Sequence, residues 1–115
     1  MNTKIEGVDP KMIANNLTPS TPIHPGEMIK DEIEFRGISQ KQLAAEIGVS
    51  PSVLNEVLNG KRAVTTEYAL LLEAALGIEA DLWLNLQTEY NKQMAQRNAS
   101  FMERLAKIRQ VASFL

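Results

Sequence analysis

Two short amphipathic segments, separated by only a few residues, constrain this chain more than any other feature. They span residues 40–47 and 51–58. Ser39 and Ser50 each stand directly before one segment, where a serine hydroxyl caps the free backbone amides at the start of a helix. Gly48 can adopt the left-handed conformation that ends a helix. The sequence therefore predicts two helices with a sharp turn between them.

The rest of the chain also carries helical signals. Residues 1–25 contain four prolines and predict an N-terminal arm, with at most a short helix near residues 10–16. Beyond the arm, apolar residues recur at helical spacing. Further helices are predicted at about residues 26–36, 65–76, 80–94 and 100–115, the last opened by a capping box of Ser100 and Glu103. One side of the 80–94 helix is expected to carry Leu82, Trp83, Leu86, Tyr90 and Met94.

No segment alternates as a β-strand would, so the predicted fold class is all-α, with about five helices plus a C-terminal amphipathic helix. We divide the chain into the arm at residues 1–25, a domain at residues 26–78 that contains the two capped helices, and C-terminal helices at residues 79–115. The last part is expected to serve dimerisation.

Composition excludes several classes of protein. A chain of 115 residues with 44% hydrophobic and 23% charged residues suits one small globular domain. It has no cysteine, so it offers no disulfide framework and no thiol nucleophile, and with a single histidine, His24, it offers no two-histidine metal site. We therefore expect no cofactor, no metal and no enzymatic activity. His24 is expected at the surface or as a helix cap.

Membrane and secretory classes are also disfavoured. The apolar runs are far shorter than the ~20 residues that a membrane-spanning helix needs. The N-terminus lacks the apolar core of a secretory signal. A cytoplasmic protein without a membrane partner is expected.

The two capped helices form a predicted helix-turn-helix. Their apolar positions, which hold the pair together, are Leu43, Ile47, Val49, Leu54 and Val57. Ala44 has a small side chain where the helices must approach closely. The alternative is an ordinary helical hairpin with a polar face. The net charge of −2 is unfavourable for DNA binding, yet residues 37–64 carry three basic and two acidic residues and form the only positive segment.

The outward side of the second helix is expected to face the major groove, where base edges are exposed. Ser52 and Asn55 are candidates for base contacts, because an asparagine amide can form two hydrogen bonds with adenine. A carboxylate at Glu56 would be repelled by phosphates, so it either accepts from a cytosine amino group or points to solvent. Phosphate contacts are expected on the flanks. The candidate DNA-binding residues are Gln40, Ser50, Pro51, Ser52, Asn55, Glu56, Asn59, Lys61 and Arg62.

Several runs of residues are shared with a known family. The runs His24-Pro25-Gly26-Glu27, Leu43 to Ser52 and Asn59 to Thr65 resemble the Xre, or lambda-repressor-like, DNA-binding domains. Ala74 to Gly77, Leu82 to Gln87 and Tyr90 narrow the resemblance to the HigA (VapI-type) antitoxins. It covers about residues 24–92 and leaves out both ends of the chain.

The resemblance implies a homodimeric antitoxin that inhibits a HigB-type toxin, a small ribosome-dependent mRNA endonuclease, and represses its own operon at a palindromic operator. It places DNA reading on Gln40 and on Ser50 to Asn59. It assigns no toxin-binding residues to this chain.

The C-terminal helix carries an apolar seam at spacings of four and three residues, formed by Phe101, Leu105, Ile108, Ala112 and Leu115. This seam can pack on its own domain, pair two protomers or bind the toxin, and we expect it to form the dimer interface. A twofold dimer would place two recognition helices about one helical turn of DNA, ~34 Å, apart.

Two other functions remain open at this point. The chain could be a plain Xre-type transcriptional regulator without a toxin partner. It could also be a protein-interaction module that has lost DNA binding, which the acidic net charge and Glu56 would favour.

Overall fold

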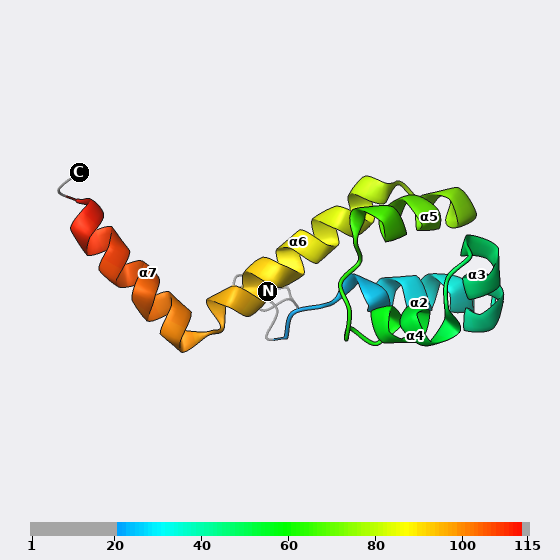
Figure 1. Cartoon of the computed structure of the whole chain (residues 1–115), viewed down its shortest axis with the longest axis horizontal. Helices are drawn as coiled ribbons and strands as arrows, with labels where there is room; N and C mark the ends of the chain where they lie inside the picture. The colour runs from blue at the N-terminus through cyan, green and yellow to red at the C-terminus, as the bar shows by residue number, and fades with distance from the viewer. Residues whose placement is uncertain (1–20, 114–115) are drawn as a thin grey trace, which may run out of the picture.

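The chain folds into helices, as the sequence predicts. The computed structural model describes residues 21–113 and shows no strand there (Figure 1). Its helices over that range are α2 (Pro25–Phe35), α3 (Gln40–Ile47), α4 (Pro51–Leu58), α5 (Thr66–Leu76), α6 (Ala80–Gln96) and α7 (Ala99–Ala112). The all-α prediction is confirmed. The short helix considered near residues 10–16 lies outside the described residues, as does Leu115 of the predicted seam.

The predicted start and stop signals of α3 and α4 are confirmed. The Ser39 hydroxyl accepts from the backbone amide of Gln42, and the Gln42 side chain accepts from the amide of Ser39 in return. Gly48 ends α3 with φ +73°, a conformation that costs other residues conformational energy. Ser50 caps α4 and is followed by proline at the first helical position. The turn between the two helices is thus built from local contacts.

The predicted cap of the last helix is wrong. Asn98, rather than Ser100, caps α7, because its side-chain Oδ1 accepts from the backbone amide of Phe101 at 3.0 Å. Asparagine and serine are both good N-caps. The helix begins at the earlier of the two.

A single core joins α2, α3, α4, α5 and the first half of α6. It includes Ile29, Leu54 and Leu72, which are completely buried, and Leu43 and Trp83, which are almost so. Burying one such large apolar side chain contributes about 1.5–3 kcal/mol relative to leaving it in water. Because Trp83 belongs to this core, the globular part continues past residue 78 into α6.

Gly26 lets α2 lie directly against the end of α4. A Cβ atom at this position would stand 2.2 Å from the carbonyl oxygen of Val57 and 2.9 Å from that of Leu58. Both atoms are backbone, so the contact leaves no room for a side chain. The close approach fixes α4, and with it the outward side of the helix-turn-helix, relative to α2.

The chain leaves the globular part along α6, and α7 lies away from it (Figure 1). No residue of α7 is buried. The predicted apolar side of α6 is wrong for Leu82, which is exposed, and Met94 is also exposed although its spacing places it on the same side as Trp83. Leu82 lies off the side of α6 that carries Trp83 and Gln87, and Met94 lies on the part of the helix that has left the globule. None of the helices within residues 21–113 is both long and apolar enough to cross a membrane.

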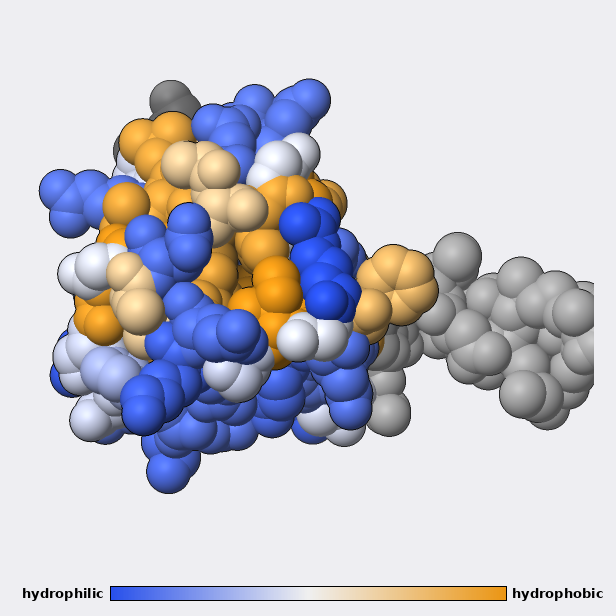
Figure 2. Space-filling view, turned by 90° about the vertical axis from the view of Figure 1, so that its right-hand side faces the viewer, coloured by the Kyte–Doolittle hydropathy of each residue, from blue (hydrophilic) through white to orange (hydrophobic). Residues whose placement is uncertain are grey.

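The end of the globular part that carries α3 and α5 has an apolar area ringed by hydrophilic residues (Figure 2). A groove lies between these two helices, lined by Glu46, Ile47, Leu71, Ala74 and Ala75.

Candidate nucleic-acid interface

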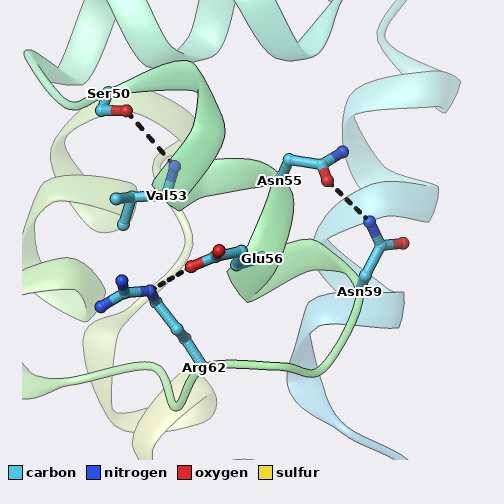
Figure 3. Close-up of polar contacts among 6 residues, drawn as sticks. All are labelled: Ser50, Val53, Asn55, Glu56, Asn59 and Arg62. Atoms are coloured by element: carbon cyan, nitrogen blue, oxygen red, sulfur yellow. Dashed lines mark hydrogen bonds and ion pairs between the residues drawn. The ribbon is translucent and has the colours of Figure 1, made fainter.

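The outward side of α4 is polar and accessible. Pro51, Ser52, Asn55 and Asn59 are exposed, and Glu56 is half-buried. The Ser50 hydroxyl accepts from the backbone amide of Val53 at 3.4 Å (Figure 3), so its first role is to cap the helix. The structure thus brings the predicted outward residues together on one face.

A chain of amide hydrogen bonds crosses this face and links three helices. Lys30 Nζ on α2 donates to Asn59 Oδ1 at 3.0 Å, and Asn59 Nδ2 donates to Asn55 Oδ1 at 3.1 Å (Figure 3). Asn55 Nδ2 then donates to Gln40 Oε1 on α3 at 3.0 Å. We call these four residues the polar ladder. It orients the Asn55 amide and still leaves that amide one N–H and one acceptor lone pair for a base.

Lys30 was not among the residues predicted from the sequence. It lies 29 positions before Asn59, on a helix that the motif does not include. The packing of α2 against α4 brings the two residues together. A pattern of neighbouring residues in the sequence therefore could not reveal the contact.

Glu56 and Arg62 form an ion pair across the end of α4, in which Arg62 Nε donates to Glu56 Oε1 (Figure 3). The hydrogen bond and charge of Glu56 raise the pKa of Arg62 above its ordinary value. From the sequence, Glu56 was expected to contact a base or to point to solvent. Neither expectation included its ion pair with Arg62. Arg62 and Lys61 are both exposed, and in the structure the Arg62 guanidinium is paired with a carboxylate.

The segment that carries Lys61 and Arg62 is anchored from α6. The buried Gln87 side chain accepts from the backbone amide of Val64 at 2.8 Å and donates to Asn91 at 2.9 Å. A buried amide with both ends satisfied fixes the backbone that it binds. Gln87 therefore sets where the chain runs after α4, a role that its sequence position does not reveal.

His24 caps α2, which was one of the two roles predicted for it. The other prediction, a surface position, is wrong because His24 is buried. Its Nδ1 accepts from the amide of Gly26 at 2.9 Å, and its ring meets the Tyr90 ring edge-on, with centroids 4.9 Å apart. The backbone of Gly60 also lies against the ring. Burial lowers the pKa of His24, with a hydrogen bond to the backbone of Arg62 acting in the opposite direction.

The lowered pKa predicts that stability falls with acidification. The unfolded chain takes up a proton at His24 near pH 6.5, whereas the folded chain does so only at lower pH, so the free energy of unfolding decreases as pH falls below about 6.5. His24→Asn keeps a capping side chain but does not titrate, and its free energy of unfolding should fall less steeply. Urea denaturation between about pH 7.5 and pH 5.5 measures the difference. Equal slopes in the two proteins would contradict the prediction.

Four of the five predicted seam residues lie on α7, outside the hydrophobic core of the described residues. Phe101, Ile108 and Ala112 are exposed and Leu105 is half-buried. Val111, which the sequence reasoning omitted, is 66% exposed and lines an apolar hollow with Ile108 and Ala112. The basic residues Arg104 and Lys107 also line this hollow.

The chain matches the helix-turn-helix family over residues 29–83. It is 40% identical over 77 residues to virulence-associated protein I of Dichelobacter nodosus, covering 66% of this chain and 71% of that protein. A solved addiction-module antidote protein of the HigA family from Coxiella burnetii has a TM-score of 0.69 at 34% identity, covering 76% of this chain and 94% of that one. The Pseudomonas aeruginosa antitoxin HigA with the higBA promoter has a TM-score of 0.64 at 32% identity, covering 73% and 90%. The chain therefore belongs to the HigA (VapI-type) antitoxins, a branch of the Xre-type helix-turn-helix proteins.

Proposed function

We propose that this protein is the antitoxin of a type II toxin–antitoxin module, which represses its own operon at operator DNA and neutralises a HigB-like mRNA endonuclease. Membership of the family supports this proposal, and one relative was solved with promoter DNA. The observation that carries the DNA-binding part is the exposed polar ladder on the outward side of α4. An ordered amide on an exposed recognition helix suits the reading of base edges in the major groove.

Each residue on this side has a proposed role. Ser52 and Asn55 contact bases, and Asn59 holds the Asn55 amide in place. Gln40 and Lys61 contact phosphates on the two flanks, and Arg62 does so once it has left Glu56. Phosphate contacts supply affinity and register, while base contacts supply sequence preference. Ser50 and Pro51 start α4 and set the angle at which it enters the groove.

Homodimerisation through α7 is the second part of the proposal. An isolated protein would leave the apolar seam of α7 in water, and a second copy would cover it. Ile108→Glu places a charge in the seam and should convert the dimer to a monomer at micromolar concentration, as measured by light scattering after size exclusion. Gln110→Glu adds the same charge on the opposite side of α7 and should leave the dimer intact. A dimeric Ile108→Glu protein would show that α7 is not the interface.

A pair of cellular assays tests the function. A reporter gene behind the upstream region of this gene should be repressed by the protein, and expression of the adjacent small toxin should arrest growth unless the protein is present. Asn55→Ala should lose repression and still relieve the arrest, because the exposed Asn55 amide serves DNA reading. Repression without any toxin to neutralise would instead identify a plain transcriptional regulator.

A further inference from the structure

The pairing of Glu56 with Arg62 has a consequence for DNA binding. Both side chains are accessible, with 43% of the Glu56 side chain and 55% of the Arg62 side chain exposed. Glu56 is the only acidic residue of α4 and follows Asn55 directly. A group that reads bases and a carboxylate that DNA should repel therefore occupy the same turn of the recognition helix.

A phosphate that contacts Arg62 competes with Glu56 for the same guanidinium. An exposed ion pair is held only weakly, so the exchange is accessible. A phosphate attracts the arginine through two parallel hydrogen bonds in the same way as a carboxylate does. The exchange satisfies Arg62 and leaves the Glu56 carboxylate without its partner.

On the base edges of the major groove, only amino groups can satisfy the released carboxylate. An ionised carboxylate accepts hydrogen bonds and donates none. Within the major groove, the donors on base edges are the N4 amino group of cytosine and the N6 amino group of adenine. A duplex without such a group opposite Glu56 leaves a desolvated, unpaired charge among phosphates, which is unfavourable.

We propose that the Glu56–Arg62 pair is a specificity switch, in which Arg62 moves to a phosphate only where the released Glu56 meets a base amino group. This rests on the proposed function, because it needs α4 to enter the major groove. The Glu56–Arg62 pair then lowers affinity for DNA of unrelated sequence and leaves affinity for the operator unchanged. The acidic residue that looked unsuited to a DNA-binding helix acts as a discriminating element.

Glu56→Gln is the direct test, with fluorescence anisotropy of the full chain on its own upstream region and on a scrambled duplex over a series of salt concentrations. Glutamine frees Arg62 and can both donate and accept. Affinity for the scrambled duplex should rise about tenfold, and its salt dependence should steepen by about 0.9, the value for one added phosphate contact. The preference for the upstream region should fall about tenfold, within the range that one mismatched base pair produces.

Glu46→Gln is the matched control. It makes the same change in net charge on the neighbouring helix α3, where Glu46 lines the groove facing α5. It should raise affinity for both duplexes slightly and equally. Thermal unfolding midpoints of both variants within a few degrees of wild type would establish that the fold is retained.

The outcomes separate the switch from the proposed function. If the wild type prefers its upstream region and Glu56→Gln keeps that preference, or weakens binding to both duplexes, the switch is wrong and DNA reading by α4 stands. A weakening on both duplexes would mean that Glu56 only positions Arg62. If the wild type shows no preference for the upstream region, the proposed repressor function fails and the switch fails with it.

Discussion

Gly26→Ala is expected to lose about 3 kcal/mol or more of the free energy of unfolding, at the upper end of the cost of overpacking a core. The added methyl group would stand 2.2 Å from the Val57 carbonyl oxygen, so α2 and α4 must separate. For a domain of this size, that loss is a large part of the total stability. Urea denaturation followed by circular dichroism measures it.

Gly37→Ala is the control for this prediction. Gly37 has φ +72° and open space where a Cβ would be, so alanine there meets conformational cost alone, about 1–2 kcal/mol. Similar losses in the two variants would show that the contact of Gly26 with α4 is not the dominant constraint.

Asn55→Ala is expected to reduce affinity for the upstream region by roughly 10- to 100-fold, which corresponds to the loss of one bidentate base contact. Affinity for a scrambled duplex should change little, because the proposed phosphate contacts remain. The exposed position of Asn55 means that stability should be nearly unchanged. Anisotropy titration on the two duplexes measures the effect.

Asn85→Ala provides the matched control for Asn55→Ala. Asn85 is an exposed asparagine on α6, so the same side chain is removed away from α4. It should bind both duplexes as the wild type does. If the two variants behave alike, Asn55 does not read the operator.

Local features of the fold could be predicted from the sequence. Ser39, Gly48 and Ser50 begin and end helices through contacts within three or four residues, so α3, α4 and the turn between them were located correctly. The burial of Leu43 and Leu54 followed from their helical spacing. The cap of the last helix was located two residues too late, because the Ser100–Glu103 pattern was taken as the helix start while Asn98 is the residue that caps it.

Contacts between distant segments could not be predicted in this way. The bond of Lys30 to Asn59 and the edge-on contact of His24 with Tyr90 depend on how α2 packs on α4 and α6. The pairing of Glu56 with Arg62 depends on the path of the chain after α4, which Gln87 anchors from α6. Most residues of the candidate site could therefore be identified from the sequence. The contacts that organise them could be seen only in the three-dimensional structure.

The most direct test of DNA reading by α4 is a titration of the purified wild-type protein against its own upstream region and a scrambled duplex at two salt concentrations. The polar ladder and the flanking cations predict tighter binding to the upstream region, with affinity for both duplexes falling steeply as salt rises. Equal, weak and salt-insensitive binding to both duplexes would contradict this account and remove α4 from the functional site.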